Sequence, residues 1–232
     1  MGAVTCISGI DTDIGKSVAT GLMARSLSAL GYSVITQKLV QTGCHGLAED
    51  ILRHRQLMGI DLLPEDLSGL TCPYVFSKPC SPHLAAELEG TAIDPDHIRR
   101  ATERLAAGFD HVLLEGAGGL LVPLTPHFTF LDYLQARGYP LILVSSPRLG
   151  SINHTLSALE LARGRGIAVK GIVYNCHGAG DAEISRDSRQ LFADFLEFYG
   201  FPACIVDLAS ADLYLEGGIP FDCLQLFREE DS

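Results

Sequence analysis

The sequence has few basic residues and gathers none of them into a cluster. Its 17 Lys and Arg stand against 28 Asp and Glu, which gives the 232-residue chain a formal net charge of −11. Nucleic acids and anionic membrane surfaces attract proteins through patches of Lys and Arg. The composition therefore argues against nucleic acid and against a membrane as partners.

A leader segment and long apolar runs are missing too. The chain moves directly into the short β-type run "AVTCIS", without a basic segment followed by an apolar core. No later segment reaches the ~20 uninterrupted apolar residues that cross a bilayer. We therefore expect a soluble protein of the cytoplasm.

The cysteines lack the spacing of a metal site. They form no Cys-x-x-Cys pair and have no companion His at zinc-finger spacing, so we expect reduced, mostly structural thiols. The seven positions are Cys6, Cys44, Cys72, Cys80, Cys176, Cys204 and Cys223.

No low-complexity tract, internal repeat or linker divides the chain. Its hydrophobic content of 47% and its length suit one well-buried core, so we expect a single domain over residues 1–232. Short apolar runs alternate with longer segments of helical periodicity, which predicts an α/β fold of three layers: a mostly parallel sheet flanked by helices.

The expected elements follow from this alternation. Strands are predicted at Ala3–Ser8, Tyr32–Lys38, His111–Leu114, Leu141–Ser145, Gly171–Tyr174 and Ala203–Val206. Helices are predicted at Lys16–Leu30, Ala48–Leu57, Pro82–Leu88, Pro95–Ala107, Phe130–Ala136, Ile152–Gly164 and Asp181–Tyr199. Ser81-Pro82 and Asp94-Pro95 each combine an N-cap residue with proline at the first helical position.

The stretch "SGIDTDIGKS" between the first strand and the first long helix is typical of a phosphate-binding loop in its place but not in its spacing. Five residues separate Gly9 from Gly15, where the usual pattern has four. A glycine-rich strand-to-helix turn presents backbone N–H groups and a positive helix end to phosphates. Lys16 would then reach the outer phosphates and Ser17 would contact Mg²⁺. The alternative is an ordinary turn with a capping Asp or Ser.

The stretch "VLLEGAGGLLVP" is the second one that indicates chemistry. An apolar strand that ends in Glu115 delivers a carboxylate to the sheet edge where the phosphate loop lies. The glycines at 116, 118 and 119 allow a ligand to approach the backbone closely. Glu115 is thus a candidate magnesium ligand, and a structural buried or capping Glu is the alternative.

Lys38 ends the second predicted strand in "VITQKLVQTG" at the same edge. A lysine there can neutralise charge on a reacting phosphoryl or carboxylate group. A solvated lysine at a strand end is an equally good interpretation of the residues alone.

Five stretches together resemble the dethiobiotin synthetase family. "GIDTDIGKS", "QKLVQTG", "CSPHLAAELEG", "LLEGAGGLLVP" and "RLGSINHTLSALE" occur in the order and spacing of that family, from residue 8 to about residue 160. The family's phosphate loop is itself one residue longer than the common one, and its fold is that of P-loop NTPases. Its members use ATP and Mg²⁺ to close the ureido ring of dethiobiotin from 7,8-diaminopelargonate and CO₂, through a carbamate and a carbamic–phosphoric mixed anhydride.

The resemblance implies a role for individual residues. The catalytic residues would be Thr12, Lys16 and Lys38, and the Mg²⁺ ligands Ser17, Asp50 and Glu115. The nucleotide would contact Asp13, Ile14, Gly15, Lys16, Ser17, Val18, Glu115, Gly116, Ala117, Gly118 and Asn175, the last reading the adenine edge. The substrate would contact Thr12, Lys38, Thr42, Gly118, Gly150 and Asn153, of which Asn153 with the neighbouring backbone would come from the second subunit of a homodimer.

Several points stay open at this stage. Glu49 neighbours Asp50 and competes with it as the metal ligand, and local turn formation competes with nucleotide binding at Asn175. His83 in "SPHLAAE" has no derived role beyond ordering a loop, and Ser151 could cap a helix in "LGSINHT".

Three positions depart from the usual family residue. This chain has Ile10 where the family usually has Thr, Leu39 where it usually has Pro, and Ser151 where Thr is common. None removes a reacting group, although substrate preference or loop rigidity could shift, and the choice between ATP and CTP stays open.

Two other classes share the expected fold. Regulatory ATPases of the partitioning and septum-placement type carry a second lysine early in the loop, where this chain has Ser8, Gly9 and Ile10. Their membrane-binding members end in a basic helix, unlike "DCLQLFREEDS". Amidating synthetases of corrinoid side chains add a glutaminase domain, for which 232 residues leave little room.

Overall fold

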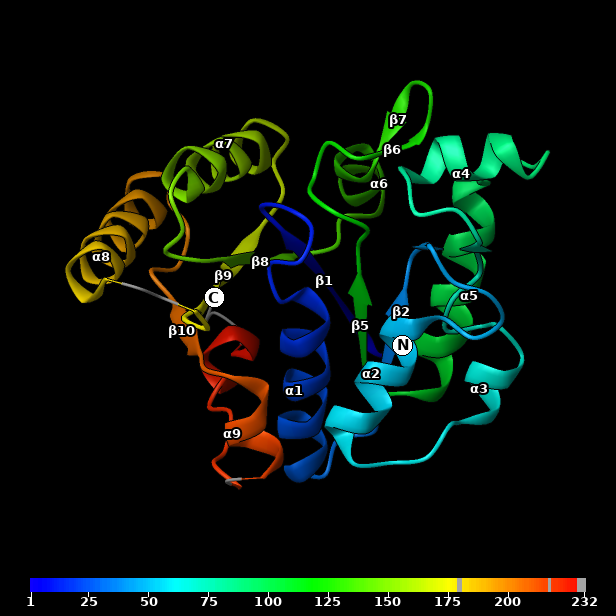
Figure 1. Ribbon diagram of the computed structural model, residues 1–232, viewed down its shortest axis with the longest axis horizontal. Helices are drawn as coiled ribbons and strands as arrows, with labels where there is room; N and C mark the ends of the chain where they lie inside the picture. The colour runs from blue at the N-terminus through cyan, green and yellow to red at the C-terminus, as the bar shows by residue number, and fades with distance from the viewer. Residues whose placement is uncertain (179–180, 217, 229–232) are drawn as a thin grey trace.

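Six parallel strands form the central sheet, in the order β10-β9-β8-β1-β5-β2 (Figure 1). The computed structural model describes residues 1–178, 181–216 and 218–228. The strands are β1 (Ala3–Gly9), β2 (Val34–Lys38), β5 (His111–Glu115), β8 (Leu141–Ser145), β9 (Val169–Asn175) and β10 (Ile205–Leu208). All six correspond to predicted strands, and the predicted three-layer α/β fold is confirmed.

Two helical layers cover the sheet (Figure 1). One face packs against α1 (Lys16–Ala29), α2 (Glu49–Met58), α9 (Ala211–Leu215) and a 3₁₀ turn at Leu224–Phe227. The other packs against α4 (Pro82–Leu88), α5 (Pro95–Gly108), α6 (Phe130–Arg137), α7 (Ser151–Gly164) and α8 (Ala182–Phe198). The seven predicted helices lie within two residues of α1, α2 and α4–α8.

Alternation along the strands divides the apolar side chains between the two layers. Cys6 of β1 belongs to the core under α4–α8, whereas the next residue, Ile7, belongs to the core under α1. In β5, Leu114 and Leu113 divide between the same two cores. Successive side chains of a strand point to opposite faces, so a strand buried on both faces must be apolar throughout. This is why continuous apolar runs located the strands in the sequence.

The predicted end strand Ala203–Val206 lies two residues too early. The observed β10 extends through Asp207, which is exposed between the buried Val206 and Leu208. An outward-facing charge is ordinary on an edge strand, but it interrupts the apolar run in the sequence.

Short elements were not predicted. They are α3 (Pro64–Leu67), α9 and the 3₁₀ turn, and the strands β3 (Gln41–Thr42), β4 (Val75–Phe76), β6 (Pro123–Thr125) and β7 (Phe128–Thr129). Elements of two to five residues are too short to show a helical or alternating period. β3 and β4 pair in parallel beyond the end of β2 and so bring Thr42 to the same edge as Lys38.

The predicted N-cap residues of three helices have different outcomes in the structure. Asp94 caps α5 by accepting a hydrogen bond from the backbone N–H of Asp96. Ser81 holds the N-cap position of α4 but makes no capping hydrogen bond through its side chain. Capping by Ser151 is wrong: the N-cap of α7 is Gly150, and Ser151 is the first helical residue.

Two further observations concern the cysteines and the helices. All seven cysteines are free thiols. Within the part of the chain that the structure describes, no helix has the length and apolar character needed to cross a membrane.

Candidate active site

The loop between β1 and α1 is held in a compact form by two residues with positive φ. Gly15 has φ 99° at the N-cap of α1, and a Cβ there would lie 2.6 Å from Nδ2 of Asn175. Asp13 has φ 54°, a conformation that Asp and Asn tolerate better than most residues. The loop therefore folds closely over the start of α1, whose free backbone N–H groups face an incoming anion.

Lys16 lies folded against this loop. Its Nζ donates to the carbonyl oxygen of Asp11 at 2.7 Å, and the residue is buried. Burial, together with the positive charge of Lys38, lowers the pKa of Lys16 to about 8. A phosphate group in front of the loop would give this ammonium an anion to which it can bond directly.

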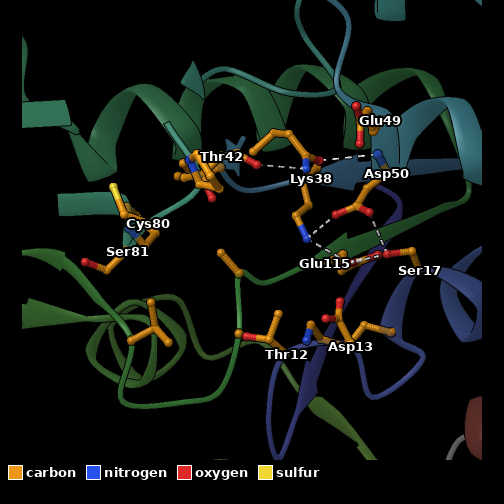
Figure 2. A pocket seen from close by; sticks show the side chains of 18 of the residues that line it. Thr12, Asp13, Ser17, Lys38, Thr42, Glu49, Asp50, Cys80, Ser81 and Glu115 are labelled. Atoms are coloured by element: carbon orange, nitrogen blue, oxygen red, sulfur yellow. Dashed lines mark hydrogen bonds and ion pairs between the residues drawn. The ribbon is translucent and has the colours of Figure 1, made fainter. Parts of the chain in front are cut away.

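Four polar side chains form the floor of the site (Figure 2). Oγ of Ser17 lies 2.8 Å from Oδ1 of Asp50 and 2.9 Å from Oε1 of Glu115. Nζ of Lys38 lies 2.6 Å from Oδ2 of Asp50 and 2.7 Å from Oε1 of Glu115. The sequence predicted these four residues from four separate segments, and the structure brings them together.

Sheet register explains the pairing of Lys38 and Glu115. They are the last residues of β2 and β5, and they stand opposite one another in the parallel pairing of these strands. Residues in register on neighbouring strands project from the same face, so the two charges meet. Lys38 is buried, and its interpretation as a solvated strand-end lysine is wrong.

The ion pair sets the charge state of both groups. Burial alone would raise the pKa of Glu115, but the charge of Lys38 and a hydrogen bond from His54 hold it well below its usual range. Burial would lower the pKa of Lys38, but Glu115 and Asp50 raise it above its usual value. Both groups are therefore ionised at neutral pH.

The donors on the floor suit a hard cation. Ser17, Asp50 and Glu115 offer oxygen atoms alone, which is the donor chemistry that Mg²⁺ prefers, usually with several retained waters. Glu49 is exposed, whereas Asp50 is hydrogen-bonded to Ser17, so the geometry favours Asp50. Across residues 1–178, 181–216 and 218–228, no three His, Cys, Asp or Glu side chains form a metal-binding group. A metal site on this floor would therefore use the hydroxyl of Ser17 beside the two carboxylates.

A pocket of about 790 Å³ opens above this floor. Figure 2 shows Thr42, Cys80 and Ser81 on the opposite side of it from Asp13 and Ser17. The predicted site residues that line it are Thr12, Asp13, Gly15, Lys16, Ser17, Val18, Lys38, Thr42, Asp50, Glu115, Ala117 and Gly118. Apart from Ile14 and Gly116, the phosphate, metal and substrate residues predicted from residues 12–118 thus share one cavity.

A second cavity of about 180 Å³ adjoins the phosphate loop through Asp13, which lines both. Ile14 and Asn175 line it as well, but the Ile14 side chain belongs to the core. Nδ2 of Asn175 donates to the carbonyl oxygen of Ile14 at 2.9 Å, and its Oδ1 accepts from the backbone N–H of His177 at 3.0 Å. Asn175 thus ties β9 to the phosphate loop.

Three predicted residues line neither cavity. Gly116 lies against Phe130, whose ring would be 2.4 Å from a Cβ at that position, so packing explains this glycine. Gly150 and Asn153 are exposed at the start of α7. His83 is half-buried in α4 and does not line the main pocket.

Sequence reasoning missed several residues of the site. His54, one turn after Asp50 in α2, lies 2.8 Å from Oε2 of Glu115 through its Nε2. Its spacing of four from Asp50 on a predicted helix was a usable signal. Arg148 pairs with Asp11 of the phosphate loop across 137 positions of sequence, and no local pattern could have shown that contact.

Known proteins resemble this chain in sequence. A family model described as an AAA domain matches residues 4–197. The ATP-dependent dethiobiotin synthetase BioD of Chlorobaculum tepidum is 55% identical over 218 residues, which cover 94% of this chain and 91% of that protein. The ATP-dependent dethiobiotin synthetase BioD 2 of Haemophilus influenzae is 58% identical over 175 residues, 75% of this chain and 92% of that protein.

Solved structures support the fold alone. A ParA family ATPase from Chlorobium tepidum superposes with a TM-score of 0.55 at 13% identity, covering 97% of this chain and 96% of that one. The MinC:MinD cell division complex of Aquifex aeolicus superposes with a TM-score of 0.54 at 14% identity, covering 94% of this chain and 87% of that one. With its phosphate loop, its charged floor and relatives more than half identical in sequence, the chain belongs to the ATP-dependent dethiobiotin synthetase family.

Proposed function

We propose that this chain closes the ureido ring of dethiobiotin, using 7,8-diaminopelargonate, CO₂ and ATP as substrates. The observation that carries the proposal is the convergence of Lys16, Ser17, Lys38, Asp50 and Glu115 on one pocket. Identity of 55% to a dethiobiotin synthetase over 94% of the chain supports the same conclusion.

ATP would lie with its phosphates over the start of α1. Lys16 and the backbone N–H groups of residues 13–18 would bind the β- and γ-phosphates, and the base would lie toward the cavity beside Asn175. Asn175 already donates one hydrogen bond to the loop, at the carbonyl oxygen of Ile14, and accepts one from the backbone N–H of His177. An amide has one further hydrogen and lone pairs free for an adenine edge.

Ser17, Asp50 and Glu115 are the residues we propose for Mg²⁺. When bound there, the cation would neutralise charge on the β- and γ-phosphates. Lys38 already lies between both carboxylates, so the cationic group that would face a transferring phosphoryl is preorganised before substrate arrives.

The diamine would occupy the open part of the pocket beside Thr12, Thr42 and Gly118. One amine adds to CO₂ and loses a proton, which gives a carbamate. A carbamate oxygen then attacks the γ-phosphorus and breaks its bond to the leaving ADP oxygen. The second amine attacks the carbamoyl carbon, expels phosphate and loses a proton, which closes the ring. Lys38 and Lys16 would stabilise the charge of the phosphoryl transfer.

A homodimer would complete the substrate site. Leu149, Ile152 and Leu121 are exposed apolar residues around the start of α7 and the loop after β5. Leu149 and Ile152 flank Gly150 closely in sequence, and exposed apolar side chains near one another are typical of a surface that another protein covers. We propose that a second copy covers it and that Gly150 and Asn153 of each subunit bind the substrate carboxylate in the other's pocket.

The remaining parts of the proposal concern the setting of the enzyme. We place a single domain over the whole chain, in the cytoplasm, where ATP and free thiols such as its seven cysteines are both found. We propose neither nucleic acid nor a membrane as a partner. A partitioning or septum-placement ATPase is not favoured, because such proteins match at only 13–14% identity, which reflects fold alone.

One reaction tests the proposal. The protein is incubated with diaminopelargonate, bicarbonate, Mg²⁺ and ATP, and the products are analysed by mass spectrometry. We expect dethiobiotin together with ADP and phosphate. If no ring product forms and ATP hydrolysis is unaffected by the diamine, the proposed function is wrong.

A further inference from the structure

His54 is a fully buried polar residue of α2 that faces the floor of the pocket from below. Its exposed fraction is 0%, and so is that of Glu115, whose Oε2 lies 2.8 Å from Nε2 of His54. Asp50 lies one helical turn earlier in α2, so one face of this helix supplies both residues.

The two oxygens of Glu115 have different partners. Oε1 accepts from Ser17 at 2.9 Å and from Lys38 at 2.7 Å. Among the described residues, Oε2 has His54 as its hydrogen-bond partner. The terminal torsion of a Glu side chain is broad, so a carboxylate bonded at one oxygen alone keeps rotational freedom. The contact from His54 removes that freedom.

The chemistry of the two groups fixes the direction of this hydrogen bond. An ionised carboxylate can only accept, so the hydrogen lies on Nε2 of His54. Nδ1 is buried and has no partner within the described residues, which leaves the contact with Glu115 as the hydrogen bond that orients the ring.

The position of His54 is set by a close crossing of α1 and α2. A Cβ on Gly21 would lie 3.2 Å from Cα of His54 and 2.8 Å from Leu57, so the helices touch backbone to backbone. Ser17 is one turn before Gly21 in α1, as Asp50 is one turn before His54 in α2. The crossing that brings Ser17 to Asp50 therefore also places His54 under Glu115.

We propose that His54 is a positioning residue for the metal site: its Nε2–H holds Oε2 of Glu115 so that Oε1 stays directed at Ser17 and Lys38. This inference rests on the proposed function, in which Ser17, Asp50 and Glu115 hold Mg²⁺. Partners of this kind orient metal-binding carboxylates and typically change metal affinity by about 10- to 100-fold when removed.

Metal binding can be measured apart from ring closure. We would titrate the intact protein, saturated with ADP, with Mn²⁺ and follow free Mn²⁺ by electron paramagnetic resonance. His54→Leu should weaken Mn²⁺ binding by about 10- to 100-fold. His54→Gln, which keeps an N–H donor at similar reach, should recover most of that loss. His54→Met replaces Leu if the first variant does not fold.

Two controls separate positioning from general destabilisation. Leu105→Ala removes a buried side chain of α5 that packs in a separate core cluster with Ile35 and Val112, away from the crossing of α1 and α2, so it should lower the melting temperature and leave Mn²⁺ affinity unchanged. If His54 acts through Glu115, His54→Leu should add little to the effect of Glu115→Gln in the double variant.

The outcomes distinguish the two proposals. Unchanged Mn²⁺ affinity in folded His54→Leu or His54→Met would overturn the positioning role, whatever reaction the enzyme catalyses. Weakened Mn²⁺ binding with rescue by Gln, in a protein that makes no dethiobiotin, would support the positioning role while the proposed function fails.

Discussion

The floor of the pocket and its rim are built in different ways. On the floor, Lys38 and Glu115 are buried, and each is bonded to several groups of the same chain. At the rim, where the main pocket adjoins the smaller cavity, Thr12 and Arg148 are exposed, and so is Asn153 on the neighbouring helix α7. The rim's link to the phosphate loop is an ion pair between Arg148 and Asp11, both about half exposed.

This difference separates what one chain completes from what it leaves open. Buried charges require partners within the fold, because their desolvation is otherwise too costly. Exposed polar groups need none, and they are free to bind a substrate or a second subunit. We therefore expect substitutions on the phosphate and floor side to act on turnover, and those on the rim to act on substrate affinity, assembly or local stability.

Lys16→Ala should have the largest effect. Its ammonium lies in the phosphate loop and would neutralise charge that grows during phosphoryl transfer. We expect turnover to fall by roughly 100-fold or more, the scale seen when a preorganised contact to the transition state is lost. Steady-state kinetics with a circular dichroism check of folding measures this. A folded variant with near-normal turnover would remove Lys16 from the phosphate site.

Asn153→Ala should change substrate affinity rather than chemistry. A hydrogen bond to a charged group contributes about 1.5–3 kcal/mol, so the KM for diaminopelargonate should rise by about 10- to 100-fold. ATP binding should stay nearly intact, because Asn153 lines neither cavity beside the phosphate loop. An equal rise of KM for ATP would contradict the assigned role.

Mixing two variants tests whether the rim is shared between subunits. If Asn153 serves the partner's pocket, a heterodimer of Asn153→Ala and Lys16→Ala has one site with both defects and one with neither. At low diaminopelargonate, where each variant alone is nearly inactive, activity should return toward half of wild type per heterodimer. If subunit exchange is verified and restores no activity, each site lies within one subunit.

The same contrast explains how much of the molecule the sequence could predict. The sheet strands and the long helices followed from apolar runs and helical periods, because burial on both faces leaves a continuous signal. The floor residues Ser17, Lys38 and Glu115 were predicted because each sits at the end or start of such an element. Parallel pairing of the strands then brings these ends to one edge of the sheet.

Contacts between distant segments left no such signal. His54 reaches Glu115 across 61 positions, and the sequence indicated its place through nothing more than its spacing of four from Asp50 on a predicted helix. The pairing of β3 with β4 rests on two residues in each strand, too few for an alternating pattern. The cap of α7 was misassigned because Ser is a favoured N-cap residue, yet the turn needs the positive φ of Gly150.

Binding of ATP should become coupled to pH through Lys16. Its pKa of about 8 in the free protein means that the ammonium is lost as pH rises through 8. Bound phosphates favour the charged form, so above pH 8 binding must take up a proton, and affinity should fall by up to about tenfold per pH unit. Calorimetry in buffers of different ionisation enthalpy measures the uptake. Lys16→Arg should bind ATP without taking up a proton. Proton uptake that persists in that variant would assign the proton to another group.

Loss of the ion pair at the rim should have the smallest effect. Arg148 and Asp11 are exposed to solvent, where water and salt screen their attraction. Pairs of this kind contribute about 0.2–1 kcal/mol, so Arg148→Ala should lower the free energy of unfolding in urea by no more than that at low salt. In 1 M NaCl the difference should vanish. Asp11→Asn is the matched control, because Asn can still accept the hydrogen bond from the backbone N–H of Thr12. A loss of unfolding free energy above about 2 kcal/mol that persists in 1 M NaCl would mean that the ion pair at the rim, like the charges of the floor, contributes to the stability of the fold.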